Sequence, residues 1–320
     1  MTDSAQEVSE QQIAGLVEAL DLIVDGDRAT EALIAVGQRS VPFLEEYLLD
    51  GRPRSLPLPR CRAVRALGEL GAWSILIAYF RQYRRPKDAA VLFAEDSVRS
   101  VAAQQLMRWK SDEVYSTLLD ASRQRATSGL ILALGEFRRP ESVPSLFAAM
   151  EDDLCREEAK EALRKVPDVA RQYAILSVRG AVTPGLYELS ALSRRRATLQ
   201  LLREFGVTPE EWPDLRDFLH DPDADVVIAA AQIGFQMAPI QDHRDIAKAL
   251  FRVSPHLNWA QEDDVGRLLD DHRDIARELA RDLVRERQIR GEHPNWLTPS
   301  WRILKHILKG ELEDTHSRTA

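Results

Sequence analysis

The chain has 320 residues, 44% of them hydrophobic, and a formal net charge of −8. It is long enough to bury a sizeable core, and its acidic total argues against general nucleic-acid binding, which grows with the number of phosphates neutralised. Its two cysteines, Cys61 and Cys155, lie far apart, without the spacing of metal ligands or of a disulfide framework. No apolar run approaches the roughly 18 residues that a membrane span needs, and the polar start, residues 1–12, lacks the pattern of a signal peptide. We therefore expect a cytoplasmic protein with no membrane partner.

The charge is distributed unevenly along the chain. Residues 1–51 carry 2 basic and 11 acidic side chains, residues 52–139 carry 16 and 8, and residues 140–320 carry 25 and 32. The net charges of the three stretches are therefore −9, +8 and −7. The total conceals a basic stretch between two acidic ones.

Short Ala-rich helices recur with a period of about thirty residues. Three of them close on Ala66-Leu67-Gly68, Ala133-Leu134-Gly135 and Gln232-Ile233-Gly234, and degenerate copies end at residues 37, 107, 164 and 203. Successive copies are 28 to 39 residues apart. A period of this size predicts stacked helix pairs, each of which buries its apolar face only against its neighbours.

Apolar residues recur at spacings of three and four along the chain, which predicts an all-α fold. A helix at about 9–24 precedes seven antiparallel pairs, which we place at about 28–50, 60–84, 95–122, 126–151, 154–178, 194–220 and 224–252. A charged helical region at about 260–290 and a short helix at about 299–310 follow. We therefore expect an α-solenoid, an armadillo-like superhelix of about seven helix pairs with helical caps. Its parts are a polar lead-in and capping helix at 1–27, the repeat array at 28–252 and a charged C-terminal cap at 253–320.

Local patterns refine this expectation. The helix at 60–70 has a broad apolar face, and its polar residues, Arg60, Arg62, Arg65 and Glu69, lie largely on the other face. Pro42 and Pro144 fit the first turns of second helices, where no intrahelical N–H bond is lost. Two irregular stretches, at 51–59 and 178–185, interrupt the rhythm, and a short helix at 186–192 is expected after the second. Insertions of this kind often lie at the binding face of a repeat array.

These motifs resemble HEAT-like repeats of the bacterial, phycobilin-lyase type. In that family an Asp and a Val-Arg precede an Ala-rich helix ending in Leu-Gly, and the next helix opens on Val-Pro-x-Leu. The matching residues are Asp96-Ser97-Val98-Arg99, Asp221 to Val227 with Val in place of Arg, Arg65-Ala66-Leu67-Gly68, Leu134-Gly135 and Ser142-Val143-Pro144-Ser145-Leu146. The resemblance covers about 28–252 and implies the solenoid. It says little about function, because the family includes scaffolds, a few enzymes and nucleic-acid binders.

Few residues have a pattern that suggests a metal or catalytic site. The seven histidines lie between His220 and His316 without the spacing of metal ligands, and Glu292-His293 reverses the His-Glu dipeptide of HEAT-like iron hydroxylases. The cluster Asp221, Asp223 and Asp225 faintly suggests a calcium loop but lacks its central Gly and closing Glu. Helix capping accounts for the cluster better. We expect no cofactor and no metal.

The basic stretch is the clearest candidate for a binding site. Its cations recur at helix ends in successive pairs, so that they could stack into a ridge: Arg81, Arg84, Arg85, Lys87, Arg108, Lys110, Arg123, Arg125, Arg138 and Arg139. Such a ridge would suit an acidic protein surface or a phosphate backbone. Arginines at helix C-termini also oppose the helix dipole, which is the structural alternative.

Three functions follow from these patterns. The first is a non-catalytic scaffold or adaptor that binds an acidic protein through its concave face and the basic ridge. The second is a nucleic-acid binder that resembles the HEAT-like DNA glycosylases, for which Trp109 beside Asp112 and Glu113 is the only local sign. The third, a bilin lyase or another small-molecule enzyme, rests on the family resemblance alone. The first is the function that the sequence favours.

Overall fold

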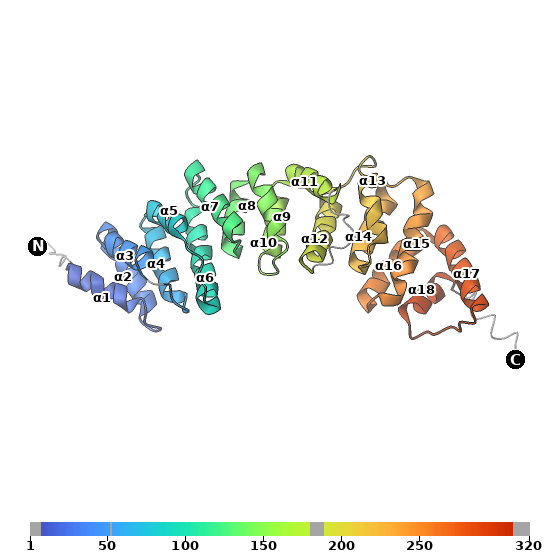
Figure 1. The fold of residues 1–320 in the computed structure, drawn as a ribbon, viewed down its shortest axis with the longest axis horizontal. Helices are drawn as coiled ribbons and strands as arrows, with labels where there is room; N and C mark the ends of the chain where they lie inside the picture. Colours follow the sequence, from blue (N-terminus) through green and yellow to red (C-terminus); the bar gives the residue numbers. More distant parts are fainter. Residues whose placement is uncertain (1–7, 52, 180–188, 310–320) are drawn as a thin grey trace, which may run out of the picture. The chain divides into compact units, whose positions relative to one another are not determined.

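Every regular element that the structure describes is a helix, as the apolar spacing predicts. The structure is a computed structural model that describes residues 8–51, 53–179 and 189–309, and of residues 178, 179 and 189–191 it describes the backbone alone. The chain divides into two units, residues 1–167 and 168–320. Figure 1 labels the helices of both. The boundary between the units falls inside the predicted 28–252 array. No helix among the described residues is long and apolar enough to cross a lipid bilayer.

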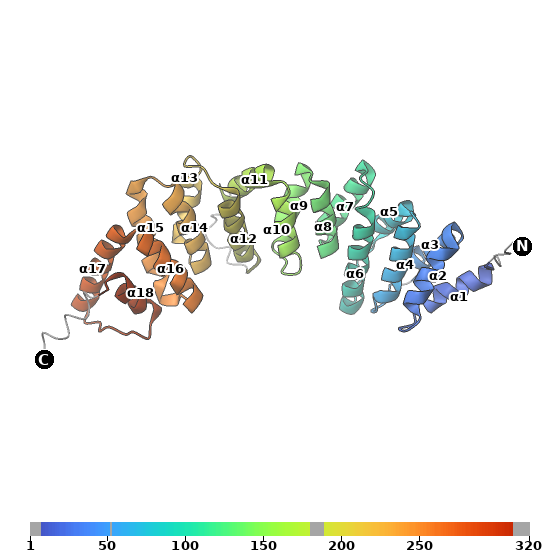
Figure 2. The ribbon, with the colours of Figure 1, turned by 180° about the vertical axis from the view of Figure 1, so that it is seen from behind.

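Unit 1 consists of helices arranged in two layers. Its α-helices are α1 (Glu10–Ala19), α2 (Gly26–Val36), α3 (Val41–Leu49), α4 (Leu58–Glu69), α5 (Trp73–Gln82), α6 (Ala89–Leu106), α7 (Asp112–Gln124), α8 (Ser128–Phe137), α9 (Val143–Ala149) and α10 (Arg156–Arg164). In one layer α2, α4, α6, α8 and α10 follow one another as neighbours, and in the other α3, α5, α7 and α9 do the same. Figure 2 shows both rows from behind. Each predicted pair in this unit is therefore present as one helix from each layer.

Unit 2 begins with α11 (Pro167–Arg179) and continues the helical pattern. The other α-helices are α12 (Leu189–Phe205), α13 (Trp212–Leu215), α14 (Ala224–Met237), α15 (His243–Val253), α16 (Trp259–Asp271), α17 (Arg273–Ile289) and α18 (Pro299–Ile307). Here α12, α14 and α16 are successive neighbours, α15 lies beside α17, and α18 packs on α16 and α17. Residues 186–188 of the expected helix at 186–192 lie outside the described residues, and its last four are the first residues of α12.

The glycines of the recurring phrase allow neighbouring helices to approach closely. A Cβ added to Gly68 of α4 would lie 2.3 Å from Gln105 of α6, and one added to Gly135 of α8 would lie 2.6 Å from Ala162 of α10. Gly71 has φ +73°, so it forms the turn between α4 and α5 in a conformation that other residues adopt at a cost. The phrase therefore has a packing role in unit 1.

The four polar residues predicted to lie outside the apolar face of the helix at 60–70 are not all exposed to solvent. Arg65 and Glu69 are exposed, but Arg60 and Arg62 of α4 are buried. Because α4 has neighbours on both sides, α2 and α6, little of its circumference is left for water. Arg60 reaches Glu95 of α6, whose other carboxylate oxygen accepts a hydrogen bond from the Tyr79 hydroxyl at 2.9 Å.

The Arg of the Val-Arg motif lies in the interior as well. Arg99 of α6 is fully buried and donates to the Ala121 carbonyl, near the end of α7, at 2.8 Å. Its guanidinium lies 4.2 Å from the centre of the Tyr83 ring. Burial lowers the pKa of Arg99 from its ordinary value. The motif residue therefore ties α6 to both helices of the other layer that flank it.

Candidate functional site

The predicted basic ridge divides between the two ends of α7. Arg139 forms an ion pair with Asp112, the first residue of α7, while Arg125 is the residue that follows its last turn. A helix of 13 residues is about 20 Å long at 1.5 Å per residue. Arg108 and Lys110 precede α7 and belong to its N-terminal end, and Arg123 belongs to its C-terminal end. The ten cations therefore do not form a single row.

Four of the ten cations form ion pairs with carboxylates on neighbouring helices. The pairs are Arg81 with Glu113 at 2.8 Å, Arg108 with Glu69 at 2.7 Å, Arg125 with Asp96 at 2.5 Å and Arg139 with Asp112. The partners are 32, 39, 29 and 27 residues apart in sequence, respectively. These separations match the repeat period, so the pairs link one repeat to the next.

Two further cations of the set also have local partners. Lys110 donates to the Glu136 carbonyl at 2.9 Å and lies 4.8 Å from the centre of the Phe137 ring. Arg123 pairs at 3.3 Å with Asp120, three residues earlier on α7. The Arg123–Asp120 pair is a local contact within one helix, whereas the partner of Lys110 lies 26 residues later in the sequence.

Three adjacent cations lack a carboxylate partner among the described residues. Arg84, Arg85 and Lys87 are exposed and lie on the connection between α5 and α6, and we call them the 84–87 cations. The only hydrogen bond that any of them makes there is from Arg84 to the neighbouring Tyr83 carbonyl, at 3.1 Å. Arg138 is likewise exposed and unpaired, in a left-handed backbone conformation with φ 53°.

Exposed apolar side chains lie at the same end of unit 1 as the 84–87 cations. Phe93, in the first turns of α6, is 66% exposed, and Leu56, just before α4, is 70% exposed. The two helices are parallel neighbours, because Arg60 meets Glu95 near their starts and Gly68 approaches Gln105 near their ends. This end of unit 1 therefore presents both positive charge and apolar surface.

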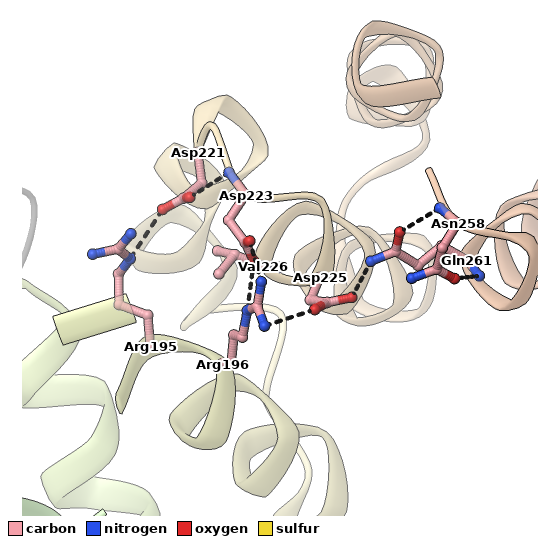
Figure 3. Close-up of polar contacts among 8 residues, drawn as sticks. All are labelled: Arg195, Arg196, Asp221, Asp223, Asp225, Val226, Asn258 and Gln261. Carbon is pink, nitrogen blue, oxygen red and sulfur yellow. Dashed lines mark hydrogen bonds and ion pairs between the residues drawn. The ribbon is translucent and has the colours of Figure 1, made fainter. Parts of the chain in front are cut away.

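The three aspartates of the suspected calcium loop are engaged with arginines in unit 2. Figure 3 shows Arg195 with Asp221 at 3.0 Å and Arg196 of α12 with both Asp223 and Asp225. Asp223 also accepts a hydrogen bond from the Val226 N–H at 3.2 Å and is the N-cap of α14, which confirms the capping interpretation. Its pKa is below its ordinary value, because the bonds from Arg196 and the Val226 N–H outweigh burial, which raises it.

The same network continues to α16. The Gln261 amide donates to Asp225, and Asn258 caps α16 by accepting the Ala260 and Gln261 N–H groups at 3.0 Å each (Figure 3). Three successive helices of one layer, α12, α14 and α16, are thus joined by one chain of polar contacts. These contacts hold the three helices together, and they occupy carboxylate oxygens of all three aspartates.

The carboxylates suggested for catalysis form ion pairs, and the two cysteines are buried. Asp112 and Glu113 beside Trp109 both pair with arginines at exposed positions. Burial raises the pKa of Cys61 to about 11 and that of Cys155 to about 12, so both thiols stay protonated at neutral pH. Among the described residues, no three or more His, Cys, Asp or Glu side chains are grouped so as to hold a metal ion.

Comparison with known proteins adds no assignment to this geometry. No protein-family model matches the chain, and no curated protein sequence matches it.

Proposed function

We propose that this protein is a non-catalytic scaffold, a HEAT-like α-solenoid, which binds an acidic partner protein through the 84–87 cations. The two-layered helix rows of unit 1, with ion pairs recurring at 27 to 39 residues, support the solenoid and the HEAT resemblance. The free, buried Cys61 and Cys155 fit a reducing compartment such as the cytoplasm.

The 84–87 cations are the main support for the proposed binding of an acidic partner. Most other cations of the basic stretch have an acceptor in the protein, so these three have the largest capacity left for an outside carboxylate. Unpaired surface charge steers association with a partner of opposite sign, and nearby apolar side chains provide area to bury on contact. Phe93 and Leu56 supply that area, 66% and 70% exposed. A phosphate backbone would use the charge but not the apolar side chains, which favours a protein partner over nucleic acid.

Reversal of these charges tests the proposal. The variant Arg84→Glu, Arg85→Glu, Lys87→Glu and the wild-type protein are used as baits in quantitative pull-downs from the native cell, at low and at physiological salt. We expect the specific acidic partner to be lost, because like charges then face each other. A low-salt gel shift with duplex DNA, run on the same two proteins, examines the nucleic-acid alternative.

The control reverses three exposed cations elsewhere, Arg28, Arg267 and Arg285, which changes the net charge equally. It should retain the partner that the 84–87 variant loses. A partner list unchanged by the 84–87 reversal removes these cations from the function. A gel shift by wild type that is lost in the 84–87 variant would mean that nucleic acid is the ligand.

A further inference from the structure

A second basic surface lies in unit 2, where the sequence is acidic overall. A groove of about 670 Å³ opens between α15 and α17. Both helices are labelled in Figure 1. Arg244, Lys248 and Arg252 line it from α15, at i, i+4 and i+8 on one helix face. Arg287 and Arg290 line it from the end of α17. Residues 140–320 carry a net charge of −7, so this concentration of cations runs against its surroundings.

The groove has an apolar floor. Phe251 of α15 and Leu279 of α17, each 6% exposed, face it together with the buried Leu304 of α18. Leu283, half-buried one turn along α17, extends the floor toward the cations. An apolar floor with convergent polar groups, in a volume of this size, is typical of a ligand site.

The cations of the groove are held by exposed ion pairs or by backbone carbonyls, and the shortest ion pair joins Arg244 to Glu278 at 2.7 Å. Arg252 donates to two backbone carbonyls, of Leu219 at 2.7 Å and Asp221 at 3.1 Å, and has no carboxylate partner among the described residues. Arg290 lies 3.9 Å from Glu286 and 3.6 Å from Glu292, longer than a good charge-assisted hydrogen bond. Lys248 pairs with Asp245 of its own helix at 3.1 Å. Such exposed pairs are weak, so a ligand carboxylate can compete for these cations.

We propose that this groove binds an acidic peptide segment of a partner protein, with one large apolar side chain flanked by carboxylates. The apolar side chain packs on Phe251 and Leu283, and the carboxylates meet Lys248, Arg252 and Arg290. The lining holds five cations and two carboxylates, Asp282 and Glu286. Three carboxylates beside the groove, Asp245, Glu278 and Glu292, also pair with its cations, so a peptide carboxylate would exchange with one of these exposed partners. Asp282 and Glu286 also disfavour a continuous phosphate backbone. The site is separate from the 84–87 cations, and its test does not depend on them.

Fluorescence anisotropy with a defined probe tests the proposal on the full chain. The probe is a fluorescein-labelled peptide of Glu and Asp around a central Phe. We expect saturable binding that weakens with salt, and a Kd at least about tenfold higher for Lys248→Glu, Arg290→Glu. Replacing the central Phe of the probe by Ala, or Leu283 of the protein by Ala, should also weaken binding. Far-UV circular dichroism establishes that each variant is folded.

The matched control is Arg28→Glu, Arg267→Glu, which makes the same change in charge on exposed residues outside the groove. Its Kd should stay within about twofold of wild type, well under one factor of ten. Absence of saturable binding, or an equal loss in both double variants, overturns the proposal. Binding that appears only after Glu311, Glu313 and Asp314 are changed to Lys would identify the chain's own end as the occupant, and would overturn a partner.

Discussion

Each unit has an Arg–Glu ion pair between neighbouring helices, but the pair is buried in unit 1 and exposed in unit 2. In unit 1 Arg60 of α4 pairs with Glu95 of α6, 35 residues away, and in unit 2 Arg244 of α15 pairs with Glu278 of α17, 34 residues away. The side chains of the first pair are 7% and 4% exposed, and those of the second are 41% and 62% exposed. Sequence separation and chemistry are alike, so burial is the variable that distinguishes them.

This difference in burial decides which charged side chains can exchange their partners. A buried ion pair has lost its hydration and must keep both partners, whereas an exposed pair holds little free energy and can exchange one partner for a ligand. Arg60 is fixed within unit 1 by Glu95 and by the Leu48 carbonyl, to which it donates at 2.8 Å. Arg244 lines the groove of unit 2, and its pair with Glu278 is exposed. The burial of an arginine between the helices therefore decides whether it can exchange its partner for a ligand.

The largest expected effect on stability comes from removing the glutamate of the ion pair in each unit. Glu95→Ala leaves the guanidinium of Arg60 buried without its carboxylate, and we expect it to lower the free energy of unfolding by about 3–5 kcal/mol. Glu278→Ala, at an exposed site, should cost less than about 1 kcal/mol. Urea unfolding measures both. As a control, Arg60→Met, Glu95→Leu should lose much less than Glu95→Ala. Equal losses for the two single variants would remove the distinction between the units.

The second effect contrasts two buried helical glycines. In unit 1, a Cβ at Gly135 would meet the Ala162 Cβ at 2.6 Å and its Cα at 3.0 Å, so Gly135→Ala must push α8 and α10 apart. We expect a loss of about 1–3 kcal/mol. In unit 2, the nearest atoms to a Cβ at Gly266 are those of His306 at 3.8 Å, so Gly266→Ala should gain up to about 1 kcal/mol from helix propensity. Thermal unfolding of the two variants gives opposite shifts, and a stable Gly135→Ala would contradict the close packing in unit 1.

The helices could be predicted from the sequence because their signals are local. Period, Leu-Gly phrases and the Val-Pro starts of α3 and α9 placed most elements within a few residues, and both prolines lie in first turns. Two helices begin several residues earlier than predicted. α6 begins at Ala89, before the predicted residue 95, and α12 begins at Leu189, before residue 194 and within the separate helix expected at 186–192. The pattern of apolar residues does not show where a helix with a mixed sequence begins.

The electrostatic roles could not be predicted in the same way. Whether Arg125 is a ligand for a partner or for Asp96 depends on a helix 29 residues earlier, and nothing within one turn of Arg125 indicates it. The groove of unit 2 combines two helix faces, neither of which suggests a binding site alone. The spacing of Arg244, Lys248 and Arg252 at i, i+4 and i+8 is a local signal, but the net charge of −7 over residues 140–320 conceals it.

A smaller effect should distinguish the units by pH. All seven histidines fall between residues 220 and 316, so the histidine response belongs to unit 2. His272 stacks on Phe235 with ring centres 3.8 Å apart and meets His243 edge-on at 5.1 Å. Burial, and then His243, lower the pKa of His272 from 6.5, while Asp271 opposes them.

The sign of the pH effect follows from proton binding. Below pH 6.5 the unfolded state takes up a proton at this histidine that the folded state resists, so stability falls until the pH passes the lower folded pKa. Urea unfolding across pH 7 to 5 should show this loss, and His272→Phe should reduce it. Val265→Ala, a destabilising change in the same unit without a titrating group, serves as the control. An unchanged pH slope in His272→Phe would assign the effect to another group.

The smallest expected effect is the response of the two matched pairs to salt. A double-mutant cycle on Arg244 and Glu278 should give a coupling of about 0.2–1 kcal/mol at low ionic strength, and most of it should vanish in ~1 M NaCl, where the Debye length is about 3 Å. The cycle on Arg60 and Glu95 should keep its coupling, because no counter-ion reaches a pair whose side chains are 7% and 4% exposed. A salt-resistant Arg244–Glu278 coupling would mean that this arginine is held by its partner as firmly as Arg60 is. The groove would then have one cation fewer to offer, and acidic peptide affinity should be insensitive to Arg244→Gln.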